Sequence, residues 1–386
     1  MCVLTISSFN SLRNTIKALA SSRVRNTPPV FLPCQSFSLA NLSFRFCFIL
    51  SLPFKLEHYR TPPPLAQCEN DFVYLRYISE GSMPRRNDHV WGIILAAGDG
   101  RRLKQYIRSR FNSDCPKQFC AFTGTRSMLA HTIARAQLWI PPERIMVTLN
   151  SKQTPFAGND VAGLEEQNII LQPSNKETTA SILLPLLHVL RRDPDARVVI
   201  FPSDHFIIEE ERFMDNVAAA AEFVENHSKY LLLLGVELRE HLTDYGWIES
   251  SMKISDIDGY EVFRVKRFLE KPNSEKLSSV QLEHCLLNTM VFVGAGATMM
   301  RKFRLLTPAV FQAFKKIDAD LLSPHEAATV SKVYADLPSV DFSGTILEHD
   351  AHGLAVLRVN NVYWSDWGNA ERIRADLAHL SDGSEL

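Results

Sequence analysis

The stretch VWGIILAAGDGRRL, residues 90–103, decides the fold of this chain of 386 residues. Its first seven residues carry no charged or polar side chain apart from the indole of tryptophan, which is typical of a strand buried on both faces. Gly98 and Gly100 follow, and glycines let a backbone turn tightly and bring its N–H groups close to a bulky anion. The stretch therefore predicts a buried strand that ends at a phosphate-binding loop. A tight turn before a solvated basic helix explains the same residues, and both interpretations stay open at this point.

Two familiar phosphate-binding loops are excluded by single features of this stretch. A dinucleotide-binding fingerprint needs a third glycine where Leu103 stands, so a hydride-transfer enzyme of the Rossmann type is disfavoured. A Walker loop is excluded because the chain has no Gly-Lys-Ser/Thr. Arg101 and Arg102 follow the turn instead, and a guanidinium group can hold phosphate through two hydrogen bonds. Lys117 adds a second candidate cation for a polyphosphate.

The rest of the chain alternates between apolar runs and helical periods, which predicts an α/β fold. The expected strands and helices cover residues 144–149, 197–201, 230–236, 182–190 and 213–224. Strands that alternate with helices form βαβ units, whose sheet is parallel. We expect a mostly parallel central sheet flanked by helices, and a smaller sub-region at roughly residues 240–386 that includes helices over 305–338.

The composition fits a globular protein with a large core, since 46% of the residues are hydrophobic and 22% are charged. The 42 Lys and Arg nearly balance the 43 Asp and Glu, which leaves a formal charge of −1. Because nucleic-acid-binding proteins usually carry a basic excess, nucleic acid is not an expected partner. The seven cysteines form no CxxC pair, so neither a disulfide framework nor a zinc site is predicted, and the reducing cytoplasm is the expected compartment.

The first 88 residues are interpreted as an N-terminal extension, and residues 89–386 as the working domain. Residues 1–56 contain no Asp or Glu, but six Lys or Arg and many serines. A transit peptide has this composition, and it stays open beside an upstream extension without a folded role, with Met83 as the first working residue. The uncharged run at residues 46–54 has nine residues, whereas a membrane span needs roughly 20, so no membrane partner is expected.

The loop and the segment after it resemble a known family. Residues 98–103, GDGRRL, followed by residues 116–119, PKQF, resemble the signature of sugar-1-phosphate nucleotidyltransferases, most closely the mannose-1-phosphate guanylyltransferase branch. That family opens with G-x-G-T-R-[LM]-x-P and continues with P-K-Q-F. Arg102 and Lys117 fall on its catalytic Arg and Lys. This chain departs from the opening pattern at two positions, Arg101 in place of Thr and Gln105 in place of Pro.

Further blocks follow in the family's order. They are QPSNKETT at residues 172–179, PSDH at 202–205, YGWIE at 245–249, FLEKP at 268–272, LNT at 287–289 and WSDWG at 364–368. In the family pattern Q-P-x-N-R-G-T-A, glycine stands where this chain has Glu177. The blocks cover nearly all of the working domain and none of the first 88 residues. The resemblance implies a Rossmann-like nucleotidyltransferase domain with a sugar-binding C-terminal sub-region.

The resemblance also implies roles for individual residues. Arg102 and Lys117 are expected to be catalytic, and Asp204 and Asp366 to hold Mg²⁺. The expected nucleotide-binding residues are Ala97, Gly98, Asp99, Gly100, Gln172 and Thr178. The residues expected to hold the sugar and its phosphate are Gly246, Glu270, Lys271 and Asn288.

The surroundings of the two aspartates agree with a metal site. Asp204 follows the apolar run at residues 198–201, so we expect it at the carboxyl end of a central strand, where open α/β sheets bind ligands. Asp366 lies between two tryptophans, and a carboxylate among apolar neighbours favours a cation as partner. A helix N-cap at Asp204 and a hydrogen-bonded buried Asp366 are the alternatives. His188 is expected to be a core or rim histidine, and His205 to orient the metal loop.

These residues and the resemblance predict Mg²⁺-dependent transfer of a nucleotidyl group from an NTP, best matched by GTP, to a sugar 1-phosphate, best matched by mannose 1-phosphate. Pyrophosphate is the second product. One alternative is the same chemistry with UTP or dTTP and glucose 1-phosphate. Another is a catalytically silent paralogue that binds nucleotide sugars and regulates a partner, which Arg101, Gln105 and Glu177 motivate. A homo-oligomer is left open, and the 18 residues after Gly368 predict a single activity.

Overall fold

The computed structural model describes residues 37–39, 42–44, 88–237 and 244–382. The chain divides into two units, Met1–Glu69 and Asn70–Leu386. The first is described only by an antiparallel pair, β1 (Phe37–Leu39) and β2 (Leu42–Phe44). Most of the predicted N-terminal extension lies outside the described residues, so its boundary stays a prediction. None of the described helices combines the length and the apolar content needed to cross a bilayer.

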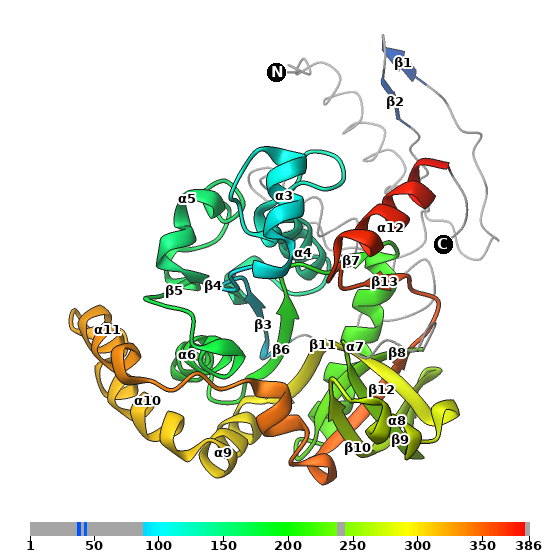
Figure 1. The fold of residues 1–386 in the computed structure, drawn as a ribbon. Helices are drawn as coiled ribbons and strands as arrows, with labels where there is room; N and C mark the ends of the chain where they lie inside the picture. The colour runs from blue at the N-terminus through cyan, green and yellow to red at the C-terminus, as the bar shows by residue number, and fades with distance from the viewer. Residues whose placement is uncertain (1–36, 40–41, 45–87, 238–243, 383–386) are drawn as a thin grey trace, which may run out of the picture. The chain divides into compact units, whose positions relative to one another are not determined.

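Nine strands of the larger unit form one sheet. They are β3 (Val90–Leu95), β4 (Ile145–Asn150), β5 (Ile169–Gln172), β6 (Arg197–Pro202), β8 (Leu231–Glu237), β9 (Gly246–Ile257), β10 (Tyr260–Glu270), β11 (Cys285–Ala295) and β12 (Leu354–Val359). Their order in the sheet is β5-β4-β3-β6-β11-β8-β12-β10-β9 (Figure 1). The α/β fold with a large central sheet flanked by helices is thereby confirmed.

The direction of the strands divides the sheet into two halves. The β5-β4-β3-β6 half is parallel, as predicted. In the other half, β12 lies parallel to β8, whereas β11 joins both β6 and β8 in the antiparallel direction. The β9–β10 hairpin, also antiparallel, closes the edge of the sheet. The parallel character expected for most of the sheet thus belongs to the first half, and the strands from residue 246 onward bring in the antiparallel pairings.

Helices surround the sheet. They are α3 (Lys104–Phe111), α4 (Met128–Gln137), α5 (Thr154–Ala157), α6 (Glu177–Arg192), α7 (Glu210–Asn226), α8 (Ser274–Ser278), α9 (Gly296–Leu306), α10 (Pro308–Asp320), α11 (Glu326–Asp336) and α12 (Ala370–Asp382). The helices expected over residues 182–190, 213–224 and 305–338 are confirmed by α6, α7 and the α10–α11 pair. His188 is buried on α6, and its Nε2 lies 2.9 Å from Glu326 Oε1, as expected of a core or rim histidine.

Both faces of the sheet are buried, because neighbouring residues of one strand enter different clusters. Ile94 and Val199 pack with α4 and α7 on one face, whereas Ile93 and Val198 pack with α6 and α9 to α11 on the other. Strands with two buried faces appear in the sequence as continuous apolar runs, which is why the sequence predicted them. The result is a three-layer arrangement in which the loops at the strand ends are free to form a site.

A third, smaller cluster lies beneath the loop after β3 and joins the two ends of the domain. Leu103, directly before α3, and Ile107 within α3 pack with Trp367 and with Ile373 of α12. A two-stranded sheet adds to this junction, since β7 (Phe206–Ile207) pairs with β13 (Trp364–Ser365). Residues about 160 positions apart are therefore held side by side, with Trp364 opposite Ile207.

Candidate active site

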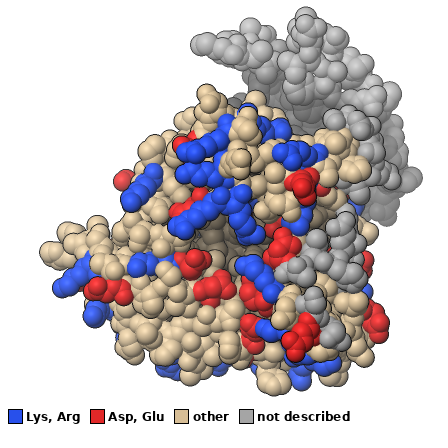
Figure 2. All heavy atoms as spheres, in the orientation of Figure 1, with Lys and Arg blue, Asp and Glu red and all other residues tan. Residues whose placement is uncertain are grey.

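A pocket of about 770 Å³ opens where β3 and β6 end. Figure 2 shows a hollow in this face of the molecule, with Lys and Arg side chains gathered over α3 and acidic side chains on the opposite side. Thirteen of the fourteen residues expected to form the site line the pocket: Ala97, Gly98, Asp99, Gly100, Arg102, Lys117, Thr178, Asp204, Gly246, Glu270, Lys271, Asn288 and Asp366. The fold therefore brings the predicted residues together, and their chemical roles stay predictions.

Gln172 is the exception, because it does not line the pocket. Its side chain is fully buried at the end of β5, and its Oε1 accepts a hydrogen bond from the Ser181 hydroxyl at 3.1 Å. Ser181 is the residue that lines the pocket at this point. The structure thus places Ser181, and not Gln172, at the pocket wall, and a role of Gln172 in base binding stays a prediction.

Hydrogen bonds from neighbouring side chains fix the shape of the glycine loop. One position of the loop has no room for a side chain unless its neighbours shift. Gly100 has a φ of +60°, and a Cβ there would lie 3.1 Å from the backbone nitrogen of Lys117. The carbonyl oxygen of Gly98 accepts hydrogen bonds from Gln118 Nε2 at 2.8 Å and from Gln153 Nε2 at 2.9 Å. Gln153 carried no sequence signal, because it lies in a short 3₁₀ turn outside every motif. These contacts preorganise the loop before any ligand binds.

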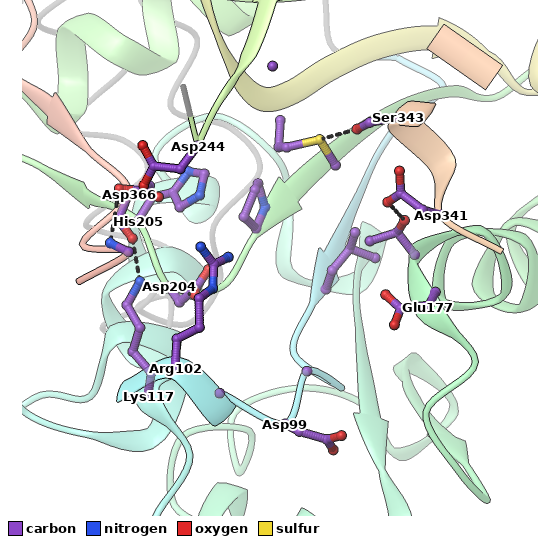
Figure 3. Close-up of a pocket in the computed structure, with 18 of the residues that line it drawn as sticks. Asp99, Arg102, Lys117, Glu177, Asp204, His205, Asp244, Asp341, Ser343 and Asp366 are labelled. Carbon is purple, nitrogen blue, oxygen red and sulfur yellow. Dashed lines mark hydrogen bonds and ion pairs between the residues drawn. The ribbon is translucent and has the colours of Figure 1, made fainter. Parts of the chain in front are cut away.

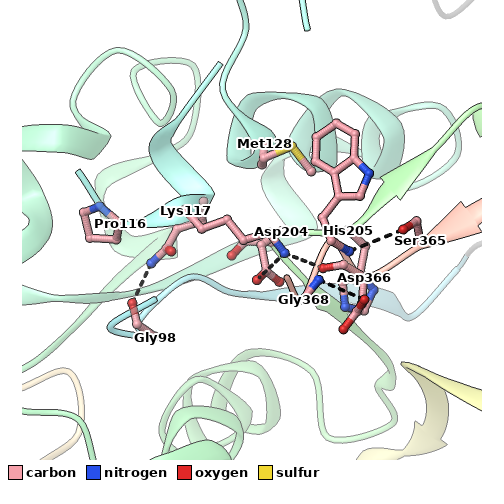
Figure 4. A network of polar contacts seen from close by, with 12 residues as sticks. Gly98, Pro116, Lys117, Met128, Asp204, His205, Ser365, Asp366 and Gly368 are labelled. Carbon is pink, nitrogen blue, oxygen red and sulfur yellow. Dashed lines mark hydrogen bonds and ion pairs between the residues drawn. The ribbon is translucent and has the colours of Figure 1, made fainter. Parts of the chain in front are cut away.

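Lys117 is a buried cation that links both aspartates (Figure 4). Its Nζ donates to Asp204 Oδ2 at 3.1 Å and also to the main-chain carbonyl oxygen of Asp366. Burial by itself would raise the pKa of Asp204, but the charge of Lys117 outweighs burial and holds that pKa below its ordinary value. Asp204 is therefore a carboxylate at neutral pH, as a metal ligand must be.

Asp366 is held by three donors to a single oxygen. Its Oδ1 accepts from the Tyr245 hydroxyl at 2.5 Å, from the backbone nitrogen of Gly368 at 2.9 Å and from Arg372 of α12. The Arg372 guanidinium also lies 4.9 Å from the centre of the Tyr245 ring. Burial works against ionisation of Asp366, but the Tyr245 hydrogen bond and the Arg372 charge lower its pKa below the ordinary value. The carboxylate is thus ionised, and its orientation is fixed.

Two of the groups that hold Asp366 were missed by the sequence analysis. Tyr245 was quoted within a motif but given no role, and burial raises its pKa, so its hydroxyl stays protonated and donates. Arg372 lies beyond the WSDWG block, in a helix whose pattern shows only one buried face. A cation six residues after a candidate ligand is a weak signal, and only the fold shows that its guanidinium group contacts Asp366.

The convergence of Asp204 and Asp366 follows from the pairing of their strands. Ser365 lies opposite Phe206 in the β7–β13 pair, which places Asp204, two residues before β7, and Asp366, directly after β13, at the same end of the pair. The rings of Phe206 and Trp367 stack with their centres 4.4 Å apart. His205 is half-buried, and loss of solvent lowers its pKa to about 4, so the neutral ring accepts a hydrogen bond from Trp364 Nε1 at 3.2 Å. These aromatic contacts thus hold the loop that carries Asp204 against the loop that carries Asp366.

The expected sugar-side residues meet at another wall of the pocket. A Cβ at Gly246 would lie 2.7 Å from the Phe268 ring and 3.1 Å from Glu270 Oε2, so this position accepts only glycine without a shift of its neighbours. Lys271 Nζ lies 3.2 Å from Glu270 Oε1. Burial raises the pKa of Glu270, and the Lys271 charge only partly opposes this effect. Asn288 is buried beside them, and its Oδ1 accepts from the Met290 backbone nitrogen at 3.1 Å.

The start of α6 forms one wall of the pocket. Hydrogen bonds join it to a segment about 160 residues further along the chain. The Thr178 hydroxyl donates to Asp341 Oδ1 at 3.1 Å and accepts from the Phe342 backbone nitrogen at 2.8 Å (Figure 3). The backbone nitrogen of Thr179 donates to the Val340 carbonyl at 3.2 Å. Asp341 and Ser343 line the pocket and were missed, because the segment that follows α11 matches no motif.

The donor set fits a magnesium ion that is bound together with a phosphate ligand. Among residues 88–237 and 244–382, no group of three or more His, Cys, Asp or Glu side chains is placed to hold a metal on its own. Asp204 and Asp366 supply two carboxylates to one pocket, and Mg²⁺ is typically held by one or two carboxylates, substrate phosphates and waters. A site of this kind is completed by its substrate.

Comparisons with known proteins agree with this geometry. The family model described as Nucleotidyl transferase matches residues 91–381. A mannose-1-phosphate guanylyltransferase of Escherichia coli is 24% identical over 282 residues, which cover 72% of this chain and 59% of that protein. One from Salmonella muenchen is 27% identical over 283 residues, 72% of this chain and 57% of that protein. The chain thus spans less than two thirds of the length of these relatives.

A solved structure provides the corresponding comparison of folds. The crystal structure described as mannose-1-phosphate geranyltransferase from Thermus thermophilus matches with a TM-score of 0.63 and 25% identity. The match covers 74% of this chain and 79% of that one. The sequence and fold comparisons therefore lead to the same group of proteins.

Proposed function

This chain belongs to the nucleotidyl transferase family, and from that premise we propose that it transfers a guanylyl group from GTP to mannose 1-phosphate. The observation that carries the proposal is the meeting of Lys117, Asp204 and Asp366 beside the glycine loop, although 249 positions separate the first and the last. The relatives from Escherichia coli and Salmonella muenchen support the choice of both substrates.

The transfer needs positioning and charge neutralisation more than proton transfer. A phosphate oxygen of the sugar phosphate forms a bond to the α-phosphorus of GTP, the bond to the bridging oxygen breaks, and pyrophosphate leaves with that electron pair. The attacking oxygen is already an anion, so no general base is required. Mg²⁺, held by Asp204 and Asp366, would neutralise charge on the phosphates. Arg102 and Lys117 would add fixed positive charge beside the backbone N–H groups of the loop.

The sugar-side residues would orient the second substrate. The carboxylate of Glu270 can accept hydrogen bonds from sugar hydroxyls, and Lys271, its ion-pair partner, is the nearest cation for the sugar's phosphate. The tight approach at Gly246 would let the sugar lie directly against the backbone. Asn288 adds an amide group at the same wall. We propose the cytoplasm as the compartment, since both substrates are soluble metabolites.

Measurement of pyrophosphate release across a panel of substrates tests the proposal. GTP, UTP, dTTP and ATP are each paired with mannose 1-phosphate and with glucose 1-phosphate, in the presence of Mg²⁺. We expect the highest kcat/KM for GTP with mannose 1-phosphate. A maximum for UTP or dTTP with glucose 1-phosphate would favour the second candidate, which keeps the chemistry but changes both substrates. Binding of GTP without release from any pair would indicate a silent paralogue.

A further inference from the structure

Glu177 places an unpartnered carboxylate in the pocket. It is the first residue of α6, its side chain is exposed, and it lines the pocket beside Thr178 (Figure 3). No hydrogen bond or ion pair joins its carboxylate to another residue in the part of the chain that the structure describes. Other acidic groups in the pocket are held: Asp204 by Lys117, Asp366 by Arg372 and Glu270 by Lys271. Glu177 is thus available to a ligand.

The backbone of Glu177 adopts a conformation that glycine adopts without cost. Its φ of +65° lies in the left-handed region, where a Cβ approaches the following carbonyl oxygen. The Asn175 side chain holds this turn, since its Oδ1 accepts from the Glu177 backbone nitrogen at 2.9 Å. The chain thus holds a charged side chain in a conformation that favours glycine. Strain of this kind persists at sites where the side chain has a function.

The distribution of charge in the pocket indicates which part of a nucleotide would lie beside Glu177. The lining cations are Arg101, Arg102, Lys117 and Lys271, and they belong to the glycine loop, the metal side and the sugar side. The wall made by Asn175, Glu177, Thr178 and Ser181 contributes no cation to the pocket. Lys176, the nearest in sequence, donates instead to the Leu337 carbonyl at 2.7 Å. A triphosphate is therefore favoured at the loop, and the uncharged base at this wall.

Asp341 is a second carboxylate on the same side of the pocket, and it differs from Glu177 in its hydrogen bonds. Asp341 Oδ1 accepts from Thr178, and its Oδ2 accepts from the Gly344 backbone nitrogen at 2.7 Å. Both oxygens of Asp341 are used within the protein, whereas both oxygens of Glu177 are left for a ligand. An ionised carboxylate only accepts hydrogen bonds, so it selects a base edge with N–H donors.

Guanine presents two adjacent donors on one edge, N1–H and the 2-amino group, and adenine and the pyrimidines do not. We propose that Glu177 is a specificity-determining residue that selects guanine by accepting from both donors. This inference rests on the proposed function, because it takes the pocket to be the donor-nucleotide site.

Inosine triphosphate, which lacks the 2-amino group, provides a sharp test. Binding of GTP, ITP and ATP is measured by calorimetry for the unaltered protein and for Glu177→Gln and Glu177→Gly. We expect the unaltered protein to bind GTP about 10 to 100 times more tightly than ITP, since hydrogen bonds to charged groups are strong. In Glu177→Gly the ratio falls close to one, and Glu177→Gln lies between the two.

A second measurement separates lost recognition from lost structure. Glu177→Gly relieves the left-handed strain, so we expect its Tm to rise by a few degrees while its selectivity falls. Glu166→Gln serves as the matched control, because Glu166 is exposed and does not line the pocket; both its Tm and its GTP/ITP ratio stay unchanged. A more stable but less selective variant cannot be explained by misfolding.

Several outcomes would overturn the proposal. These are a GTP/ITP ratio near one in the unaltered protein, a ratio that Glu177→Gly leaves intact, and no nucleotide binding at all. An altered KM for the sugar phosphate with an intact ratio would assign Glu177 to the other substrate and also count against the proposal. Failure of the proposed function is distinguishable, because a protein that releases no pyrophosphate still has a measurable GTP/ITP binding ratio.

Discussion

The two ends of the pocket are built in opposite ways. At the loop end, Lys117, Asp204 and Asp366 satisfy one another, and Tyr245 and Arg372 hold the last of them. At the α6 end, Glu177 is strained and unpartnered among the described residues. Groups that stabilise a reacting phosphate must be in place before the substrate arrives, whereas groups that recognise a base need free hydrogen-bonding capacity. The comparison predicts large catalytic effects at the first end and effects on selectivity at the second.

Removal of Lys117 should have the largest effect. Lys117→Met deletes the charge that links Asp204 to the Asp366 main chain, and we expect kcat to fall about 10³-fold, or about 4 kcal/mol of transition-state stabilisation. Steady-state pyrophosphate release measures the effect, and a thermal melt checks that the variant is folded. A folded variant with kcat within tenfold of the unaltered protein would show that the loop end does not carry the chemistry.

Arg372 should act through Asp366. Arg372→Ala removes one of three donors to Asp366 Oδ1, and loss of a group that orients a metal ligand typically costs about 10- to 100-fold. We expect a lower kcat with little change in the KM for GTP, and partial recovery in Arg372→Lys. A rise in the KM for GTP alone, with kcat unchanged, would indicate that Arg372 contacts the nucleotide and does not position the aspartate.

The two loop glycines provide a matched pair. Gly100→Ala forces a side chain into a φ of +60° and within 3.1 Å of the Lys117 nitrogen, whereas a Cβ at Gly98 meets nothing within 4 Å. We expect Gly100→Ala to lower the free energy of unfolding by about 1–2 kcal/mol and to lower activity. Chemical denaturation should show a much smaller change for Gly98→Ala. Equal destabilisation of both variants would contradict the loop geometry.

The smallest effect concerns the sugar side. Burial raises the pKa of Glu270, so the folded protein disfavours its ionised form, and this carboxylate is destabilising at any pH above its folded pKa. We expect Glu270→Gln to raise the Tm by about 2 °C at pH 7 while it impairs turnover. The gain disappears below about pH 4, where the native Glu270 is protonated in both the folded and the unfolded chain. A gain that persists at low pH would point to a cause other than charge.

The sequence predicted the parallel half of the sheet because those strands are buried on both faces and read as apolar runs. It could not predict that β11 enters in the opposite direction, since burial on two faces produces the same run in either direction. The ordered motifs located most of the pocket for a similar reason: most of them lie within a strand, at its end or in the turn that follows it, where the backbone sets their position.

The groups missed in the pocket share a different property. Arg372 reaches Asp366 from the next helix, and Asp341 reaches Thr178 across 163 positions. Neither contact matches a motif, because the first depends on the orientation of α12 relative to the loop before it and the second on the packing of distant segments. Gln172 is the opposite case. Its motif predicted a place at the base pocket, but the packing of α6 puts Ser181 between Gln172 and the pocket. Motifs thus identify the loops of a site, and packing decides which atoms face the ligand.

Metal binding tests most directly whether the aspartates of two distant segments form one site with the nucleotide. Mn²⁺ is titrated into the unaltered protein, Asp204→Asn and Asp366→Asn, each with a non-hydrolysable GTP analogue, and free Mn²⁺ is followed by electron paramagnetic resonance. We predict that each substitution weakens Mn²⁺ binding by more than about tenfold, and that the double variant is little worse than either. Affinities for Mn²⁺ that equal those of the unaltered protein in both single variants would contradict the account.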